Sequence, residues 1–358
     1  MRNNIIPDHM SKEDVESFGE EMLQLKHEIS LDQEGFSHSH LGKMLPTRIF
    51  LLSATAFLFG IFSSNLVAVV ASFIFYFLWY TQTAYFAHLS LHGSWGNKDY
   101  AHPLSVVSDG KYPFPFVETT SWKSGHNATH HVYTNIYNVD PDVDYGVFRL
   151  SKAVPWKPIY LGNILWGIAG VFFSLEVQHH HASVFAKKKN KAYLPLFLKG
   201  FLGTLLRWSP HIVILPTLVY LLGSNPWIPV FCFWGSQMLA NLLITFVLLS
   251  GHTYNCVVFD ENVKQSENFA EWSLLQIQGT NNLHFNNPIL DMLLCEFTHG
   301  LSTQTEHHLF PVSSSTQQFE AKKRVKEICK KYGIKYNSTH YLRSLIEVPV
   351  RLIRYSLP

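Results

Sequence analysis

The chain of 358 residues is 47% hydrophobic and only 15% charged, a composition that is apolar for a soluble protein and favours a membrane. Its formal net charge of +2 is too small to indicate nucleic acid or another strongly charged partner. The 20 histidines, set against 28 lysines and arginines together, make metal binding an expectation before any motif is considered.

The N-terminal part of the chain is polar, and no short apolar secretory signal precedes the first apolar tract. We expect a polar cytosolic leader over residues 1–46, a membrane domain over residues 47–350 and a short tail over residues 351–358. The four cysteines are too widely spaced for a CxxC metal motif or an obvious disulfide framework, which indicates free thiols in a reducing compartment.

Two long apolar tracts each predict a helical hairpin. Residues 49–87 are apolar except for a break at Ser63-Ser64-Asn65, and a bilayer core needs about 20 helical residues, so this tract is long enough for two helices. A second hairpin is predicted around the turn GSNP at residues 223–226. The four predicted spans cover residues 47–63, 66–88, 203–222 and 227–250.

The distribution of positive charge predicts the orientation of these spans. No lysine or arginine occurs between Arg48 and Lys98 or between Arg207 and Lys264, so both hairpin tips lack positive charge. By the positive-inside rule, both termini and the large middle region face the cytosol. The apolar stretch 158–178, which glycines interrupt, predicts an interfacial segment. The expected fold is an all-α, polytopic membrane protein with a cytosolic helical cap; a soluble all-α protein is the alternative.

Histidines gather in three motifs on the predicted cytosolic side. The HLSLH motif ends the second span, and its i, i+4 spacing places both rings on one helix face. HNATHH lies in the middle region, and QTEHH follows the fourth span with i, i+3, i+4 spacing. His252 follows the fourth span as His92 follows the second. The candidate metal ligands are His88, His92, His126, His130, His131, His252, His307, His308 and Gln304.

Any one of these motifs alone is more often a pair of solvated histidines. The convergence of all three on one side of the membrane favours a metal site. Eight imidazoles exceed what one metal needs, because zinc sites close at four ligands. Two metals fit the count, and ligation by nitrogen without cysteine suits iron as well as zinc or copper. Two irons beside a bilayer are suited to activating O2 against an unactivated C–H bond of a lipid chain.

The order HxxxH, HxxxHH, QxxHH and the spans around these boxes resemble the integral-membrane fatty acid desaturases. The segment WKSGHNATHHVYTNIYNVDPDVDYG at 122–146 is similar to the second-box region of bacterial and cyanobacterial acyl-lipid desaturases, and residues 276–311, ending in QTEHHLFP, to their third-box region. The resemblance implies a non-haem di-iron centre held by the eight histidines. It also implies an enzyme that uses O2 and external electrons to introduce a C=C bond into the acyl chain of a lipid or acyl-CoA.

Gln304 is typical of front-end members of that family, and the sequence leaves open whether it binds iron or orients a neighbouring ligand. The chain contains no HPGG motif of a fused cytochrome b5, so the expected electron donor is separate: a ferredoxin, or cytochrome b5 with its reductase. The alternatives are a hydroxylase, acetylenase or carotenoid-modifying oxygenase on the same scaffold, or a non-enzymatic haem or zinc membrane protein.

Polar residues near the second and third boxes are candidates for supporting roles. An acidic cluster after the second box could hydrogen-bond to the outer nitrogens of ligating histidines, or it could be a solvated loop. Three asparagines match the third-box region of the family, and structural or ligand-supporting roles are expected for them. These residues are Asp140, Asp142, Asp144, Asn281, Asn282 and Asn287.

Overall fold

The computed structural model describes residues 1–31, 66–92, 123–143, 149–165, 167–168, 209–264 and 266–358, and a few positions between 48 and 58. Within these residues the chain is mostly helical, with one two-stranded sheet, in agreement with the predicted all-α class. The first predicted span falls almost entirely outside the described residues, as do Asp144 and the start of the third span.

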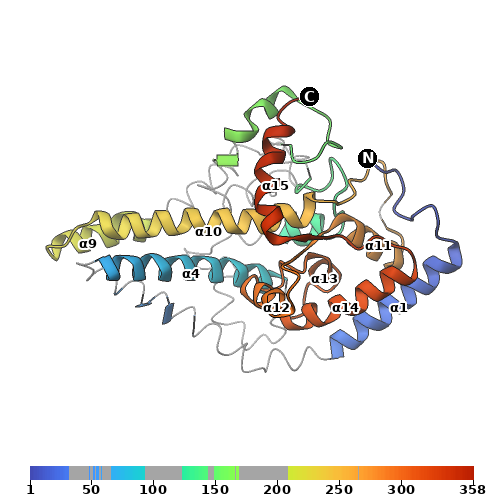
Figure 1. Ribbon diagram of the computed structural model, residues 1–358, viewed down its shortest axis with the longest axis horizontal. Helices are drawn as coiled ribbons and strands as arrows, with labels where there is room; N and C mark the ends of the chain where they lie inside the picture. The colour runs from blue at the N-terminus through green and yellow to red at the C-terminus, as the bar shows by residue number, and fades with distance from the viewer. Residues whose placement is uncertain are drawn as a thin grey trace.

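Two long apolar helices run side by side and carry the cap at one end (Figure 1). α4 (Leu66–Leu91) and α10 (Trp227–Thr253) begin at the first residues of the second and fourth predicted spans. Among the described residues, α10 is the one helix long and apolar enough by length and composition to cross a membrane. The four-span topology therefore stays a prediction.

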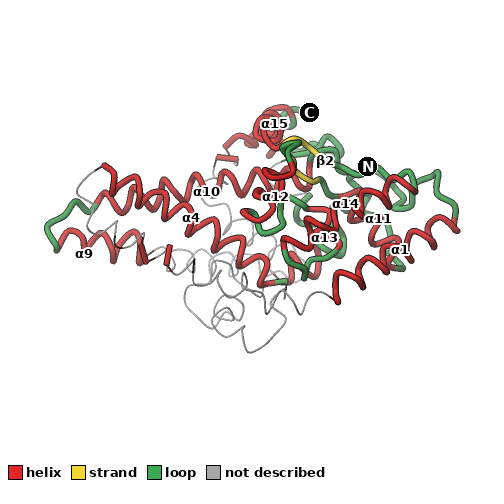
Figure 2. The backbone as a smooth tube through the Cα atoms, turned by 60° about the horizontal axis from the view of Figure 1, so that its bottom comes forward, coloured by secondary structure: helices red, strands yellow, loops and turns green. Residues whose placement is uncertain are grey.

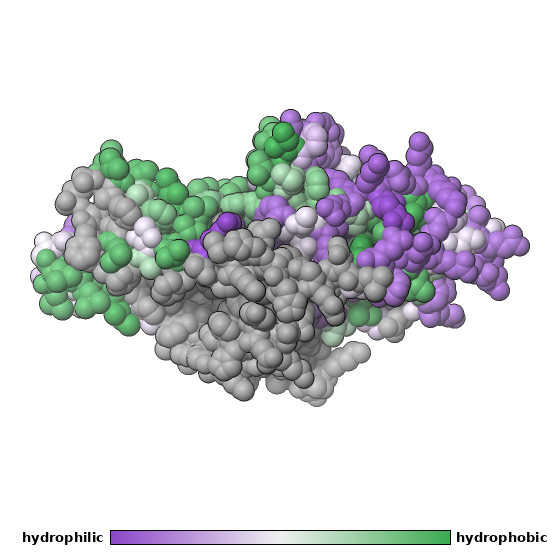
Figure 3. Space-filling model, turned by 90° about the horizontal axis from the view of Figure 1, so that it is seen from below, coloured by the Kyte–Doolittle hydropathy of each residue, from purple (hydrophilic) through white to green (hydrophobic). Residues whose placement is uncertain are grey.

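The contact between α4 and α10 is close and apolar. Tyr80 of α4 and Ala240 of α10 are buried in the same cluster. A Cβ atom on Gly235 would lie 2.8 Å from the ring of Phe73, so a larger residue here would require that ring to move. On the outside of the pair, large side chains such as Trp227 are exposed. Figure 3 shows apolar residues over much of the described surface at the end of the molecule away from the cap. Exposed apolar side chains of this number indicate a surface that contacts apolar surroundings.

A short helical element leads into α10 at the predicted hairpin turn. A π-helical turn, η4 (Pro210–Ile214), continues directly into α9 (Leu215–Leu221). Gly223 follows with a φ of +77°, a left-handed conformation that glycine adopts without a steric penalty. The turn predicted from GSNP is therefore confirmed.

Among the described residues, the C-terminal part of the cap contains five helices, three of which begin with a side-chain cap (Figure 2). Asn268 caps α11 by accepting from the backbone N–H of Glu271, and Asn287 caps α12 in the same manner. Ser314 and Gln317 form a reciprocal capping box at the start of α14. The helices are α11 (Phe269–Gly279), α12 (Pro288–Phe297), α13 (Gln304–Leu309), α14 (Ser315–Lys331) and α15 (Tyr341–Arg354).

A two-stranded parallel sheet joins distant parts of the cap. β1 (Asn282–His284) pairs with β2 (Ser338–His340), with Leu283 opposite Thr339. β1 leads toward α12, whereas β2 runs directly into α15. The sheet thus fixes the position of α15 relative to the segment that precedes the third histidine box.

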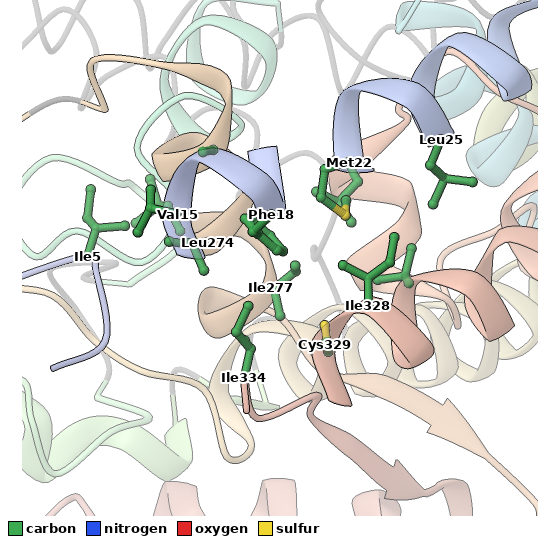
Figure 4. Close-up of a cluster of buried hydrophobic side chains, with 14 of the residues drawn as sticks. Ile5, Val15, Phe18, Met22, Leu25, Leu274, Ile277, Ile328, Cys329 and Ile334 are labelled. Carbon is green, nitrogen blue, oxygen red and sulfur yellow. The ribbon is translucent and has the colours of Figure 1, made fainter. Parts of the chain in front are cut away.

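The N-terminal region contains a folded helix, α1 (Lys12–Leu31), that the sequence analysis did not predict within its polar leader. Its apolar side chains pack against α11 and α14 in the largest core cluster (Figure 4). Phe18 and Met22 are fully buried there, and the ring of Phe18 meets Tyr332 edge-on with centroids 5.7 Å apart. Glu21 forms an ion pair with Lys331 at the edge of the contact.

Because α1 completes this core, Phe18→Ala should destabilise the cap by about 3–5 kcal/mol, as large aromatic truncations in cores do. The matched control is Leu23→Ala on the same helix, where the side chain is 55% exposed and a change within about 0.5 kcal/mol is expected. Unfolding of the detergent-solubilised protein in a denaturant series measures both. Equal midpoints for the two variants would contradict the packing role of α1.

Candidate metal centre

The residues predicted to bind metal all lie where α4 and α10 meet the cap, and they come from four segments. α4 ends with the first box, and α10 carries His252 in its last turn. The second box lies on and just after a π-helical turn, η1 (Lys123–His130), a conformation that is frequent at functional sites. The short helix α13 carries the third box. The structure brings all eight histidines and Gln304 into one cluster, in which His88, His92 and His126 are partly buried and the other members are buried.

The first group of histidines joins all three boxes. One ring nitrogen from each of His88, His92, His126 and His307 lies within 4.8 Å of the others. The Nε2 atom of His126 is 3.1 Å from Nε2 of His88 and 3.1 Å from Nε2 of His131. A metal bound at about 2.0–2.1 Å separates neighbouring ligand nitrogens by about 3.0–3.4 Å, so these spacings match the edges of a coordination polyhedron.

The second group contains His130, His252 and His308, whose ring nitrogens also lie within 4.8 Å of one another. Nε2 of His130 is 3.2 Å from Nε2 of His308. The two groups are neighbours, because the ring of His131 stacks on His308 with centroids 4.1 Å apart. The amide nitrogen of Gln304 lies 2.8 Å from Nε2 of His252, which places Gln304 at the edge of the second group.

A glycine in α10 makes room for this glutamine. A Cβ atom on Gly251 would lie 3.0 Å from Cγ of Gln304 and 3.2 Å from its Cδ. Such contacts are tighter than a side chain in a packed interior tolerates without moving. A side chain at residue 251 would therefore displace Gln304 by a few tenths of an ångström unless the two helices moved apart.

The protonation of the cluster suits a metal. His307 is fully buried, yet neither of its ring nitrogens has a hydrogen-bond partner among the described residues. A buried polar atom left without a partner costs about 1–3 kcal/mol, which a bound cation would offset. Burial lowers the pKa values of His126, His131, His307 and His308, so these rings are neutral and offer a lone pair. The residues present therefore fit a metal.

Asp140 fixes the orientation of His130. Nδ1–H of His130 donates to the buried carboxylate at 2.9 and 3.0 Å, which turns Nε2 toward His308. The carboxylate also accepts from the backbone N–H of Asn135 at 2.6 Å and of Asp142 at 2.9 Å. Burial lowers the pKa of His130, but the charges of Asp140 and Asp142 outweigh burial and raise it to about 9. Of the acidic cluster, Asp140 makes the contact that the sequence suggested.

Gln276, to which the sequence analysis assigned no role, supports both groups. Its Oε1 atom accepts from Nδ1–H of His308 at 2.8 Å and from the hydroxyl of Thr134 at 2.6 Å. Its amide donates to the backbone carbonyl of His131 at 3.1 Å. The sequence signal that could have identified it is a glutamine within the largely apolar segment FAEWSLLQIQG of α11. The structure buries this side chain fully, and buried glutamines are rare unless they are hydrogen-bonded.

The asparagines of the third-box region hold the backbone around α13. Asn282 accepts from the N–H of Thr305 at 2.8 Å and donates to the carboxylate of Glu306 at 2.6 Å. Tyr336 donates to the other carboxylate oxygen at 2.8 Å, and burial raises the pKa of Glu306 to about 7. Asn281 donates to the backbone carbonyl of Ser250 at 3.1 Å, which ties the end of α10 to β1.

We compared the chain with protein families and with characterised proteins, and the matches are to proteins named as fatty acid desaturases. The profile of the family described as fatty acid desaturase matches residues 63–340. The chain is 25% identical over 285 residues to an NADPH-dependent stearoyl-CoA 9-desaturase of Mycobacterium tuberculosis, covering 76% of this chain and 63% of that protein. It is also 25% identical over 245 residues to an sn-1 linoleoyl-lipid 6-desaturase of Synechocystis, covering 63% of each.

A Delta(6)-fatty-acid desaturase of Caenorhabditis elegans is 25% identical over 314 residues, which cover 79% of this chain and 66% of that protein. The match thus spans 63% of the length of the mycobacterial and cyanobacterial relatives. No solved structure matches the chain.

Proposed function

Since the chain belongs to the fatty acid desaturase family, we propose that it introduces a C=C double bond into an acyl chain, using O2 and electrons from an external donor. The observation that carries the proposal is the convergence of eight histidines from four segments into two neighbouring groups, all of whose members are buried or partly buried. A haem carrier would need only two axial histidines, and a closed zinc site needs four ligands, so both alternatives leave half of the cluster unexplained.

We assign one non-haem iron to each group. His88, His92, His126, His131 and His307 would hold the first iron, because His131 joins this group through its 3.1 Å contact with His126. His130, His252 and His308 would hold the second, with Gln304 beside them. When bound, the two irons supply the activation of O2 that removal of hydrogen from an unactivated chain requires.

The reaction removes two hydrogens from adjacent carbons and, with two electrons and two protons from outside, reduces O2 to two waters. The chain contributes imidazoles that burial keeps neutral, such as that of His307, an aspartate that orients the ring of His130, and a site whose burial excludes bulk water. The electrons would come from a separate donor, a ferredoxin or cytochrome b5 with its reductase.

The proposed substrate is an acyl chain attached to a lipid or to coenzyme A, because the printed names of the relatives include both classes. Members of the family are generally membrane-bound, and α10 could serve as a span. We further propose the multi-pass arrangement of four spans, with the metal centre and both termini on the cytosolic side.

Metal content and the visible spectrum of the purified, detergent-solubilised protein test the proposal first. About two irons per chain without a Soret band are expected, because imidazole ligands without porphyrin give no such band. One haem per chain, or zinc retained after expression in iron-supplemented cells, would overturn it. Mass spectrometry of lipids from expressing cells then separates a double bond, a mass loss of two hydrogens, from a hydroxyl group, a mass gain of one oxygen.

Gln304→Ala should lower iron affinity about 10–100-fold, the usual effect of removing a group that supports or completes a metal site. Gln304→His should retain iron, because imidazole provides a nitrogen at the same edge of the second group. Iron remaining after equilibration with a series of chelators measures the affinity, and Gln24→Ala on the exposed face of α1 is the control. If Gln304→Ala matches the control, the glutamine is only a packing residue.

A further inference from the structure

α15 presents an apolar stripe to its surroundings. The stripe residues recur every three or four positions, which places them on one face of the helix. The opposite face is packed against the protein, where Ser344 and Val348 are buried. The exposed fractions are 56% for Leu342, 66% for Ile346, 46% for Val350 and 56% for Ile353. An exposed apolar stripe of this length marks a surface that something apolar covers.

The position of α15 indicates what covers it. The helix crosses α10 at a steep angle near the C-terminal end of α10 (Figure 1). Arg351 fixes this crossing: its Nη1 atom donates to the backbone carbonyl of Thr253 at 2.7 Å, and its guanidinium lies 4.8 Å from the ring centre of Tyr254. Because Thr253 is the last residue of the apolar helix α10, α15 lies where a span would leave the bilayer.

A second segment extends the apolar surface. The short 3₁₀ helix η2 (Pro158–Gly162) and the residues after it expose Leu161 and Leu165 at 61% and 72%. This segment packs directly on α15, because Asn163 donates to the backbone carbonyl of Leu352 at 3.0 Å. Figure 3 shows apolar atoms along one side of the α15 region and hydrophilic atoms on its other side. We call α15 and residues 158–165 the interfacial platform.

The charges of α15 complement an anionic surface. Helical geometry places Arg343 and Arg354 along one flank of the stripe. The side chain of Arg343 is 65% exposed, and its ion pair with Glu347 is long, at 3.5 Å. With three arginines and one glutamate, the net charge of α15 is +2. A helix with an apolar stripe flanked by arginines is typical of helices that lie in the headgroup region of a bilayer.

We propose that the interfacial platform lies flat in the cytosolic headgroup region, with its stripe among the acyl chains and its arginines at anionic lipid phosphates. The platform would hold the histidine cluster at a fixed height above the bilayer. β2 runs directly into α15 and pairs with β1, whose Asn282 holds the backbone of α13. The inference requires membrane attachment but neither iron nor desaturation, so it can fail or succeed independently of the proposed function.

Site-directed spin labels on the full-length protein in phosphatidylcholine vesicles test the placement. Single cysteines at Ile346→Cys and Ile353→Cys would carry nitroxides, and Lys326→Cys on the exposed face of α14 is the matched control. The unsubstituted chain supplies the labelling background, since Cys232, Cys295 and Cys329 are fully buried and Cys256 is partly buried. Collision with oxygen, which concentrates in lipid, is compared with collision with a water-soluble nickel chelate.

The stripe labels should lose nickel accessibility and gain oxygen accessibility relative to Lys326→Cys. Equal nickel accessibility at all three positions would overturn the proposal, because the stripe would then face water. Low accessibility to both reagents at the stripe would also overturn it, because a protein surface would then cover the helix. All three positions are exposed, so the labels do not perturb the core.

Vesicle composition tests the headgroup contact. Replacing part of the phosphatidylcholine with anionic phosphatidylglycerol should move the label at Ile346→Cys deeper into the bilayer. The shift should disappear when Arg343→Gln and Arg354→Gln are added, and it should persist when Lys323→Gln and Lys326→Gln are added instead. The absence of a shift in the labelled parent, or its persistence without the two arginines, would overturn the role of anionic lipid.

Discussion

His307→Ala should remove iron from the protein and abolish formation of the double bond while leaving the chain in the membrane fraction. His307 belongs to the first group, and its ring centre lies 4.7 Å from that of His88 and 4.8 Å from that of His92. Groups that only orient a ligand are worth about 10–100-fold in metal affinity, so loss of a ligand itself should cost at least about 100-fold. Alanine leaves no nitrogen to replace it.

Three measurements on the same preparations check this result: iron per chain by plasma mass spectrometry, the amount of protein in the membrane fraction, and the fatty acid profile of expressing cells. The matched control is His340→Ala, a partly buried histidine of β2 outside both groups, for which iron and product should match the parent. Unchanged product from His307→Ala would refute the ligand assignment. His308→Ala should reproduce the loss through the second group.

The sequence could predict the candidate ligands because their spacing is local. An i, i+4 pair must share a helix face wherever the helix lies, and the rings of His88 and His92 are indeed 4.8 Å apart. Sequence spacing could not predict which rings meet. His130 and His308 are 178 residues apart and meet only because α13 and η1 converge at the end of α10. Gln276 was missed for the same reason, since its role depends on a tertiary contact.

The N-terminal helix is a different case, because its signal was present in the sequence. Val15, Phe18, Met22 and Leu25 recur at helical spacing and are all buried. The charged residues of α1 as a whole outnumber these four, so average polarity indicated a solvated leader. The two strands, of three residues each, are too short for an alternating pattern to predict. Their pairing is decided by the packing of the cap.

Asp140→Asn should lower the iron affinity of the second group about 10–100-fold and also destabilise the metal-free protein. Each carboxylate oxygen of Asp140 accepts from a backbone N–H, one from Asn135 and one from Asp142, and both also accept from His130. An asparagine must place its NH2 group at one of these positions, where it faces another donor. The unpaired donors should cost about 1–3 kcal/mol.

The control Asp142→Asn separates orientation of the ring from general electrostatics. The Asp142 carboxylate is 25% exposed and lies 3.5 Å from Nδ1 of His130, so it contributes charge without holding the ring. If net charge alone favoured iron, both neutral variants would lose affinity equally. If the hydrogen bond to Nδ1–H matters, Asp140→Asn should lose far more in chelator competition. Equal losses would mean that His130 points toward His308 without help from Asp140, and that packing around η1 alone fixes its tautomer.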